Sequence, residues 1–285
     1  MRLVRFDLGD DLRPGVLDGD EVVDLSRVTL SVETVIEGGR VALDRVREAL
    51  PTAPRHPLEQ VRLAAPIRPA SLRDFLAFED HAKAGAARRG EEVNAAWYEQ
   101  PVYYKGNHRS ILGPDEPLTW PSFTEQLDFE LELACVLGTR GRDLDEQRAT
   151  GAIFGYTIMN DWSARDVQRA EMAMRLGPAK SKDFATSLGP CVVTADEFDP
   201  TDGLSMRVRV NDEVWFETKD ARMHWSFPKM IAYVSRSEDV YPCDVYGSGT
   251  AYRGCGLDQD RWIARGDVVE LEIEGIGSLR TPVLA

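Results

Sequence analysis

The segment that decides the fold class is residues 128–137, with the sequence DFELELACVL. Polar and apolar residues alternate at its start, so the pattern predicts a β-strand that carries Asp128, Glu130 and Glu132 on one face. The simplest interpretation is a half-buried strand whose acidic face lies in water. Three like charges on one face repel one another, however, unless a cation or basic side chains lie over them. Because clustered carboxylates suit a hard divalent cation such as Mg²⁺, the segment is also a candidate metal site.

Further strands are predicted over most of the chain after Pro66, at residues 127–137, 191–193, 206–214 and 267–273. The turn pairs Asn211-Asp212 and Asp202-Gly203 separate some of them. Helical patterns interrupt only at about residues 75–87 and 227–235. This excess of strands favours a β-rich α+β fold over a doubly wound parallel sheet.

The N-terminal residues read as a small module of their own. Residues 3–8 and 21–25 are predicted strands, and the turn residues of 14–20 between them indicate a hairpin-like unit. Residues 32–50 show helical spacing, 52–57 resemble a linker, and 61–63 form a further short strand. We therefore expect a small β-containing module at residues 1–65 and a larger catalytic domain at residues 66–285.

The composition excludes several classes of protein. With 285 residues and 43% apolar side chains, the chain can bury a core without needing a disulfide or a metal to fold. The 34 basic and 48 acidic residues give a net charge of −14, which argues against nucleic acid and anionic membrane partners. No apolar run approaches the ~20 residues of a membrane helix. Four scattered cysteines without CxxC spacing and no evident targeting segment favour a cytoplasmic protein.

Other polar segments carry weaker signals. In residues 159–168, MNDWSARDVQ, three polar residues recur at about helical spacing, which indicates a helix start near Asp161 or simply a capped surface helix. Residues 177–186 form a loop with two lysines, which are usually solvated. The GSGT loop at 247–250 lacks the pattern of a phosphate-binding loop. His81 on its own is more often a packed helix residue than a base, and the other histidines show no zinc-ligand pattern.

The order of these segments resembles the fumarylacetoacetate hydrolase family over about residues 66–284. The motifs that carry the resemblance are DFELE at 128–132, MNDWSARD at 159–166, KDFAT at 182–186 and SGT at 248–250. The resemblance implies a compact mixed β-roll domain, usually paired as a homodimer, with Mg²⁺, or else Mn²⁺ or Ca²⁺, in its mouth. It also implies a small-molecule dicarbonyl or 2-oxo acid substrate.

Residues that match the family pattern inherit expected roles. Glu130, Glu132 and Asp161 match three carboxylate metal ligands, and Asp74 matches a fourth. His81 matches the water-activating histidine. Its acidic partner would be Asp258, where the hydrolase pattern has a glutamate, one methylene longer. The residues expected around the reacting oxyanion are Arg165, Gln168 and Lys182, and those expected near metal or substrate are Tyr104, Thr186, Thr250, Met172 and Leu76.

The implied chemistry is the cleavage of a C–C bond next to a carbonyl. The carbanion that leaves is tolerable only as an enolate that a Lewis acid stabilises. Lys182 and Arg165 would add positive charge, and His81 would take a proton from water. The lead hypothesis is hydrolysis of an acylpyruvate or a fumarylacetoacetate-like 1,3-dicarbonyl. The alternatives are decarboxylation, hydration or isomerisation of a 2-oxo acid, and a metal-stabilised dimer without activity. A working pair of His81 and an acid would favour hydrolysis.

Some positions depart from the family pattern. Leu76 and Met172 stand where the tyrosine-catabolic enzyme has tyrosines that hold the distal end of its substrate, so we expect a different, more apolar substrate tail. Smaller relatives have a glutamate three residues after the histidine, where this chain has Ala84. A mobile lid at about 84–100 would bring Glu91 or Glu92 to that place, and an uninterrupted surface helix is the alternative for this segment.

Overall fold

Three β-sheets dominate the structure, a computed structural model that describes residues 1–9 and 11–285. Within these residues the longest sheet has 12 strands. They are β1 (Arg2–Asp7), β2 (Leu12–Asp18), β3 (Glu21–Asp24), β4 (Arg55–Pro57), β5 (Arg62–Ala64), β6 (Ser71–Phe75), β7 (Tyr103–Gly106), β8 (Ile111–Leu112), β11 (Leu131–Leu137), β12 (Ile153–Asp161), β14 (Thr186–Thr194) and β17 (Asp244–Gly247).

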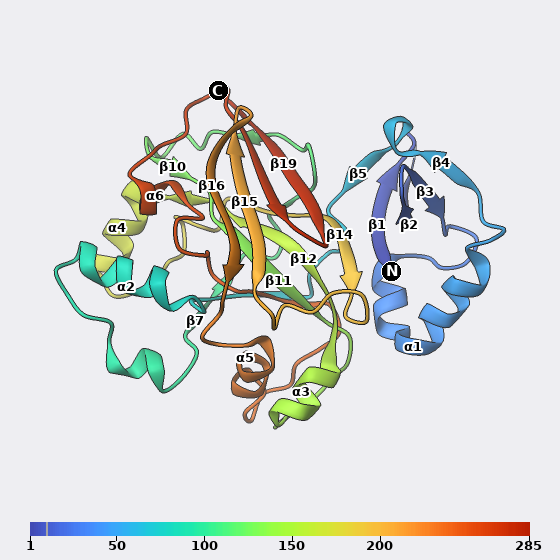
Figure 1. Ribbon diagram of the computed structural model, residues 1–285, viewed down its shortest axis with the longest axis horizontal. Helices are drawn as coiled ribbons and strands as arrows, with labels where there is room; N and C mark the ends of the chain where they lie inside the picture. The colour runs from blue at the N-terminus through green and yellow to red at the C-terminus, as the bar shows by residue number, and fades with distance from the viewer. Residues whose placement is uncertain (10) are drawn as a thin grey trace.

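The other elements complete a β-rich α+β fold (Figure 1). A second sheet contains β9 (Leu118–Thr119), β15 (Leu204–Val210), β16 (Glu213–Ala221), β18 (Val268–Ile273) and β19 (Gly277–Leu284), and a ribbon pairs β10 (Leu127–Asp128) with β13 (Ser163–Ala164). The helices are α1 (Val32–Ala49), α2 (Glu79–Arg88), α3 (Glu146–Ala152), α4 (Arg165–Ala173), α5 (Phe227–Val234) and α6 (Gly256–Gln259), with 3-10 turns at Leu58–Gln60 and Ala95–Tyr98. The predicted fold class is confirmed.

The long sheet joins the N-terminal strands to strands of the rest of the chain up to β17, and its main path has the order β4-β3-β2-β1-β14-β12-β11-β17-β6-β7. Strand β1 pairs with β14 through Arg2 and Val193, so the N-terminal strands extend the same sheet as the rest of the chain. Most neighbours are antiparallel, whereas β17 and β6 are parallel, and the sheet is therefore mixed. Figure 1 shows α2, α4 and α6 gathered at the opposite end of the molecule from α1.

Strand β11 is buried on both faces because packed layers cover each of them. Leu131 and Leu133 belong to the core that includes Leu271 of the second sheet, whereas Ala134 and Val136 belong to the core that also contains residues of α1. Successive side chains thus alternate between two apolar cores. The expectation of an acidic face in water is wrong, because the carboxylates at the start of this segment are buried as deeply as its leucines.

The strand predicted at residues 127–137 is interrupted at residues 129–130. Its first two residues form β10, which pairs with β13, and β11 begins only at Leu131. Asp128 leaves the long sheet because its carboxylate accepts hydrogen bonds from Arg165 and from the backbone N–H groups of Gly256 and Leu257. The predicted strand at 206–214 is likewise divided, by the predicted turn at Asn211-Asp212.

In the N-terminal unit, the turn expected over residues 14–20 is confined to Gly19 and Asp20, and β2 covers the rest. Position 15 of this strand requires glycine, because a Cβ there would lie 2.7 Å from Val22 Cγ1. The predicted helix at 32–50 is confirmed as α1, with a bend at Gly39, whose φ is +54°. The predicted linker at 52–57 is wrong at its end, since β4 pairs with β3 there.

Two helix predictions need correction near the candidate site. The helix expected from residue 75 begins only at Glu79, because Phe75 still belongs to β6 beside β17 and residues 76–78 are neither helix nor strand. Asp161 ends β12 instead of starting a helix, and α4 begins at Arg165. An uninterrupted helix over 84–100 is also wrong, because α2 ends at Arg88 and a 3-10 turn follows. The predicted helix at 227–235 is confirmed as α5. None of the helices in the described ranges is long and apolar enough to cross a membrane.

Candidate active site and metal centre

Four carboxylates converge at one place on the long sheet. Asp74 lies in β6, Glu132 in β11 and Asp161 at the end of β12, while Glu130 immediately precedes β11. One oxygen of each lies within 4.8 Å of an oxygen of every other. All four side chains are buried, with at most 6% of any residue exposed. Because β12, β11, β17 and β6 are consecutive strands in the sheet, their pairing brings together carboxylates that are far apart in sequence.

The small-residue loop after β17 cradles two of these carboxylates. A Cβ at Gly247 would lie 2.5 Å from Asp74 Oδ1 and 2.7 Å from Glu132 Oε2, so the carboxylates occupy the space that a side chain would need. The backbone N–H of Gly249, a residue with φ +76°, donates to Asp74 Oδ1 at 3.1 Å and to Glu132 Oε2 at 3.0 Å. The GSGT segment at 247–250 therefore lines the carboxylate cluster.

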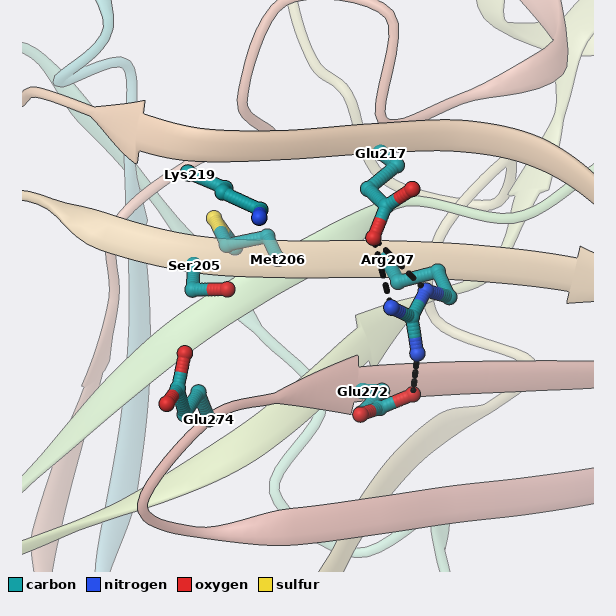
Figure 2. A pocket seen from close by; sticks show the side chains of 7 residues that line it. All are labelled: Ser205, Met206, Arg207, Glu217, Lys219, Glu272 and Glu274. Carbon is teal, nitrogen blue, oxygen red and sulfur yellow. Dashed lines mark hydrogen bonds and ion pairs between the residues drawn. The ribbon is translucent and has the colours of Figure 1, made fainter.

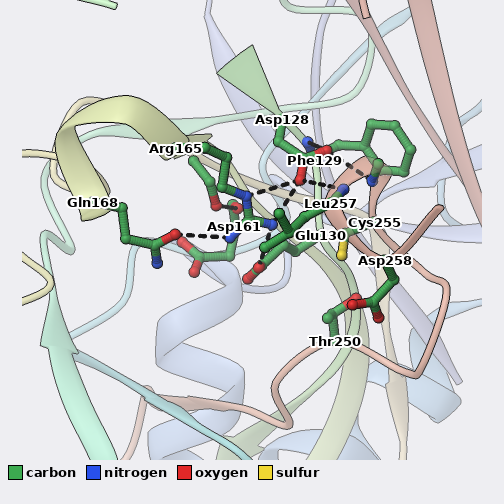
Figure 3. A network of polar contacts seen from close by, with 12 residues as sticks. Asp128, Phe129, Glu130, Asp161, Arg165, Gln168, Thr250, Cys255, Leu257 and Asp258 are labelled. Carbon is green, nitrogen blue, oxygen red and sulfur yellow. Dashed lines mark hydrogen bonds and ion pairs between the residues drawn. The ribbon is translucent and has the colours of Figure 1, made fainter. Parts of the chain in front are cut away.

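Two buried cations lie against the cluster. Lys182 Nζ donates to Glu130 Oε2 at 2.8 Å and also to Asp161. Arg165 Nη2 donates to the other oxygen of Glu130 at 2.6 Å, and its Nε donates to Asp128 Oδ2 at 2.8 Å (Figure 3). Each cationic side chain is only 4% exposed. The expectation that a lysine in this loop is solvated is wrong for Lys182, although it holds for exposed Lys180.

The two cations neutralise only one side of the cluster. Burial opposes the ionisation of Glu130, but Lys182 and then Arg165 outweigh it and lower the pKa of this carboxyl. Burial, reinforced by Asp161, raises the pKa of Asp74 well above its ordinary value. Burial and the neighbouring Asp74 do the same to Glu132. The raised pKa values indicate that this side of the cluster has too little positive charge to offset the repulsion between buried carboxylates.

The donor set fits a hard divalent cation. Glu132 Oε1 is buried and has no hydrogen-bond partner among the residues that the structure describes. A buried carboxylate oxygen without a donor is costly unless an ion binds it. Carboxylate oxygens are the ligands that Mg²⁺, Mn²⁺ and Ca²⁺ prefer. A cation centre is thus indicated by three observations, namely the unpartnered oxygen of Glu132, the four converging carboxylates and the raised pKa values.

A histidine and an aspartate form a pair beside the cluster. His81 Nδ1 lies 2.8 Å from Asp258 Oδ2, and the Asp258 side chain is fully buried. Arg88, seven residues after His81 on α2, donates to the second oxygen of Asp258 at 2.8 Å. The backbone N–H of Arg253 also donates to Asp258, at 2.9 Å. Although burial opposes it, the hydrogen bond from His81 and the adjacent donors lower the pKa of Asp258 and keep it ionised.

The pair of His81 and Asp258 adjoins the cluster through Cys255. The ligand atoms of His81 and Cys255 lie within 4.8 Å of one another, and Cys255 forms a backbone bridge with Glu130. His81 Nε2 has no hydrogen-bond partner within residues 1–9 and 11–285, and 13% of the side chain is exposed. Asp258 thus holds one ring nitrogen while the other stays available. The shorter aspartate reaches His81, and neither Glu91 nor Glu92 is needed as its partner.

The remaining expected site residues divide into two groups. Tyr104 donates to Asp161 Oδ2 at 2.7 Å, and Gln168 accepts from Arg165 Nη1 at 2.9 Å, so both support cluster residues. Thr250 Oγ1 donates to the backbone oxygen of Leu131 at 3.2 Å, directly after the glycine loop. Buried Thr186 opens β14 opposite Asp161, to which it is paired.

Two expected substrate contacts lie outside the cluster. Met172 is 53% exposed on α4. Leu76 directly follows β6, and its backbone oxygen accepts from Trp97 Nε1 at 2.9 Å. This contact fixes the 3-10 turn within the expected lid segment to the strand that carries Asp74.

Sequence reasoning missed three groups at the site. Asp128 orients Arg165, Arg88 binds the second oxygen of Asp258, and the N–H of Gly249 binds two cluster carboxylates. Only Arg88 left a usable signal, because residues seven apart on a helix lie on the same face as one another. The other two depend on contacts between distant segments.

Two surface pockets lie elsewhere. One, of about 370 Å³, lies on the outer face of the second sheet, where Arg207 is ion-paired with Glu217 and Glu272 (Figure 2). The other, of about 470 Å³, lies beside the start of α2 and β16. None of the expected site residues lines either pocket, although Arg253, whose backbone N–H donates to Asp258, lines the second.

This fold and site define a class: a β-rich protein with a buried carboxylate centre suited to a divalent cation. The family model for the fumarylacetoacetate (FAA) hydrolase C-terminal domain matches residues 71–284, and a model described as Rv2993c-like, N-terminal, matches residues 1–66. The chain belongs to the fumarylacetoacetate hydrolase family, and the resemblance seen in the sequence is confirmed.

Similar proteins catalyse different reactions. The mitochondrial oxaloacetate tautomerase of Xenopus laevis is 30% identical over 298 residues, which cover 100% of this chain and 90% of that protein. The solved fumarylacetoacetate hydrolase of Exiguobacterium antarcticum is 32% identical, with a TM-score of 0.83 over 100% of this chain and 99% of its own. The 5-carboxymethyl-2-hydroxymuconate delta-isomerase of Mycobacterium smegmatis is 28% identical, with a TM-score of 0.76 and the same coverage. The likeness shows an enzyme family, without selecting one reaction.

Proposed function

We propose that this protein is a metal-dependent hydrolase that cleaves a C–C bond in a 1,3-dicarbonyl substrate of the acylpyruvate or fumarylacetoacetate-like class. The observation that carries the proposal is the pair of His81 and Asp258, joined at 2.8 Å beside the carboxylate cluster. Hydrolysis needs a base to activate water, and this pair supplies one. The hydrolase of Exiguobacterium antarcticum, similar over the whole chain, supports the same reaction class.

The four carboxylates Asp74, Glu130, Glu132 and Asp161 would hold the cation, for which Mg²⁺, Mn²⁺ and Ca²⁺ are the candidates. When bound, such an ion supplies a Lewis acid that polarises the carbonyl oxygens of a dicarbonyl. Lys182 and Arg165 keep positive charge fixed beside the same place, because their ion pairs with Glu130 hold them rigidly. Tyr104 and Gln168 restrict the motion of these groups through their hydrogen bonds.

His81 has the central role in the chemical step. Nδ1–H donates a hydrogen bond to Asp258, which leaves Nε2 as the nitrogen that takes a proton from water. The water oxygen then bonds to the acyl carbonyl carbon, and the bond from this carbon to the central carbon breaks. Its electron pair becomes the enolate of the leaving oxo acid half, which finally takes up a proton on carbon. Water is consumed, and the products are a carboxylic acid and an oxo acid, which is a 2-oxo acid from an acylpyruvate and a 3-oxo acid from a fumarylacetoacetate-like substrate.

A panel of substrates tests this proposal. The enzyme, supplied with Mg²⁺ or Mn²⁺, is given acylpyruvates, fumarylacetoacetate, oxaloacetate and 2-oxo-hept-3-ene-1,7-dioate, and the loss of ultraviolet absorbance is followed. The expected products are equimolar carboxylic acid and pyruvate from an acylpyruvate, and equimolar fumarate and acetoacetate from fumarylacetoacetate. His81→Ala should lower turnover by about 10² to 10⁴-fold. His56→Gln, in the N-terminal strand β4, is the matched control and should not. Near wild-type turnover in His81→Ala would refute the proposal.

A second candidate is tautomerisation of oxaloacetate or isomerisation of a related 2-oxo acid. The oxaloacetate tautomerase of Xenopus laevis, which matches the entire chain, supports it. Such a reaction moves a proton between carbon and oxygen and consumes no water. Conversion of enol to keto oxaloacetate without pyruvate or CO₂ would identify it, whereas release of CO₂ would indicate decarboxylation. Metal binding without turnover of any compound would leave a non-catalytic dimer.

For the assembly we propose a homodimer. Three apolar side chains at the end of α4 and beyond it support this, because Met172, Met174 and Leu176 are 53%, 72% and 83% exposed. Three large apolar side chains exposed within five residues are unusual on a surface that contacts only water. Light scattering coupled to size exclusion tests the proposal, and a monomer mass at micromolar concentration would contradict it.

A further inference from the structure

A second group of metal-ligating side chains lies beside the carboxylate cluster. His81, Cys255 and Asp258 each offer one ligand atom, and these atoms lie within 4.8 Å of one another. Figure 3 shows the Cys255 thiol and the Asp258 carboxylate together at the edge of the polar network. Cys255 immediately precedes α6, which carries Asp258, and His81 approaches from α2. The group was invisible in the sequence because its histidine and its cysteine come from distant segments.

The donor atoms of this group differ from those of the carboxylate cluster. The cluster offers only oxygen, which suits Mg²⁺ and Ca²⁺. The second group offers nitrogen, sulfur and oxygen, a set typical of zinc bound by three protein ligands with a fourth position open. Two neighbouring centres would therefore select different cations through the chemistry of their donors.

The geometry needs only a small adjustment to close around an ion. Ligand atoms on one tetrahedral zinc lie about 3.3 to 3.8 Å apart, given bond lengths near 2.0 to 2.3 Å. Atoms within 4.8 Å of one another reach that spacing when side chains shift by about 1 Å. Cys255 Sγ has no hydrogen-bond partner in the described part of the chain, so its proton can be displaced without breaking a contact.

The surroundings hold the ligands in place. Arg88 donates to Asp258 Oδ1 at 2.8 Å, and the backbone N–H of Arg253 donates to Oδ2 at 2.9 Å, so both oxygens are held in position and Oδ2, which faces His81, is the one that would bind an ion. The thiol is completely buried, whereas His81 is 13% exposed and marks the side from which an ion can enter. A buried thiol beside an accessible imidazole and a fixed carboxylate is a preformed set of ligands.

We propose that His81, Cys255 and Asp258 form a second metal site of zinc type, distinct from the carboxylate cluster, and that its occupation inhibits the enzyme. The inhibition rests on the proposed function, because the ion takes the side chains that activate water. The binding of the ion does not rest on it. Zinc thus acts as an inhibitor of an enzyme whose working cation is held by oxygen ligands.

Cobalt spectroscopy tests the binding directly. Co²⁺ is titrated into the full-length protein in a large excess of Mg²⁺, which saturates the carboxylate cluster. The wild type should develop the intense near-ultraviolet charge-transfer band of a cobalt–thiolate bond, and Zn²⁺ should abolish it. Cys255→Ser should show no such band. Cys135→Ser is the matched control, since that thiol is equally buried but belongs to the apolar core, and it should retain the band. Circular dichroism confirms that each variant is folded.

Two results would overturn the binding proposal. The band would be absent from the wild type, or it would persist in Cys255→Ser while being lost in Cys135→Ser. If Cys255→Ser fails to fold, Cys255→Ala and alkylation protection decide the question instead. The wild type is labelled with a thiol reagent under mildly denaturing conditions, in which buried thiols become accessible. Saturating Zn²⁺ should then protect Cys255 from the reagent, and equal labelling with and without Zn²⁺ would contradict the site.

Inhibition is tested on a substrate that the panel identifies. In saturating Mg²⁺, Zn²⁺ should inhibit the wild type, and Cys255→Ser should keep its basal turnover but need roughly 100-fold more Zn²⁺, since it lacks one of three ligands. Equal sensitivity of the two proteins would show that zinc acts at the carboxylates and would overturn the inhibitory role. If no substrate is turned over, the proposed function fails, and the cobalt band still decides the site on its own.

Discussion

Asp74 and Glu132 share a single hydrogen-bond donor, the backbone N–H of Gly249, which lies 3.1 Å from the first carboxylate and 3.0 Å from the second. Lys182 and Arg165 are committed to the opposite side of the cluster, where they bind Glu130. Two buried carboxylates that share one hydrogen-bond donor are electrostatically unfavourable. The protein maintains this arrangement at a cost in stability, and a bound divalent cation would remove that cost.

Proton release should accompany metal binding. Burial and mutual repulsion raise the pKa values of Asp74 and Glu132, so the metal-free protein retains protons on these carboxyls above the ordinary range. Cations displace those protons, and the affinity for Mn²⁺ should therefore increase as the pH rises through the raised pKa values. Calorimetry in two buffers that differ in ionisation enthalpy measures the protons released. An affinity that does not change with pH, with no protons released, would contradict the assignment.

The same shifts predict how the stability of the metal-free protein depends on pH. A carboxyl with a raised native pKa binds its proton more tightly in the folded state than in the unfolded chain. Its contribution is present at low pH and is lost as the pH rises from the ordinary carboxyl range through the native pKa. Added Mn²⁺ should therefore raise Tm more at pH 8 than at pH 6. A rise in Tm with Mn²⁺ that is larger at pH 6 than at pH 8 would contradict this prediction.

Glu132→Gln should separate stability from metal binding. At a pH above the raised pKa of Glu132, where the wild-type carboxyl must ionise, the substitution removes one uncompensated buried charge and keeps the shape of the side chain. The metal-free protein should then gain about 1 to 2 kcal/mol, and each kcal/mol corresponds to roughly 2–4 °C in Tm. The increase in Tm on adding Mn²⁺ should largely vanish. Glu274→Gln, an exposed glutamate, is the control and should change stability by less than about 0.5 kcal/mol. A lower metal-free Tm in Glu132→Gln would refute the charge imbalance.

The sequence predicted the face on which Glu130 and Glu132 lie, because side-chain direction in a strand follows from local alternation. It did not predict their depth, since burial of β11 on both faces requires the second sheet and the core around α1. Lys180 and Lys182 illustrate the same limit. They lie two residues apart in one loop, and only the tertiary structure makes one exposed and the other buried.

Family resemblance could predict the pairing of distant residues, whereas local sequence patterns could not. His81 and Asp258 are separated by 177 residues, and no periodicity connects them. The family resemblance suggested the pair. The structure adds Arg88, which lies on the same helix as His81 and donates a hydrogen bond to the Asp258 carboxylate. The break before Leu131 was equally unpredictable, because it depends on the ion pair between Asp128 and Arg165.

Asp258→Asn should reduce turnover strongly while leaving metal binding intact. The amide removes the charge that orients His81 and leaves Arg88 without its partner, so kcat should fall by about 10² to 10⁴-fold. Mn²⁺ affinity should stay near the wild-type value, because Asp258 lies outside the four-carboxylate cluster. Asp260→Asn is the control, since this exposed residue has φ +50°, which asparagine tolerates. Loss of Mn²⁺ binding in Asp258→Asn would mean that the two groups are not separate.

Gly247→Ala tests whether the glycine loop exists to accommodate the carboxylates. The added methyl group would lie 2.5 Å from Asp74 Oδ1 and 2.7 Å from Glu132 Oε2, and it would also collide with Met159. We expect a loss of about 1 to 3 kcal/mol in stability together with loss of Mn²⁺ binding, because the carboxylates must move apart.

Gly151→Ala is the matched substitution in α3, where a Cβ meets nothing within 4 Å. Alanine is the better helix former by up to about 1 kcal/mol, so this variant should be as stable as the wild type or more so, with unchanged Mn²⁺ affinity. Thermal unfolding with and without Mn²⁺ measures both effects. A Gly247→Ala protein that binds Mn²⁺ like the wild type would show that the cluster tolerates a side chain in the loop, and the small residues after β17 would then need another explanation.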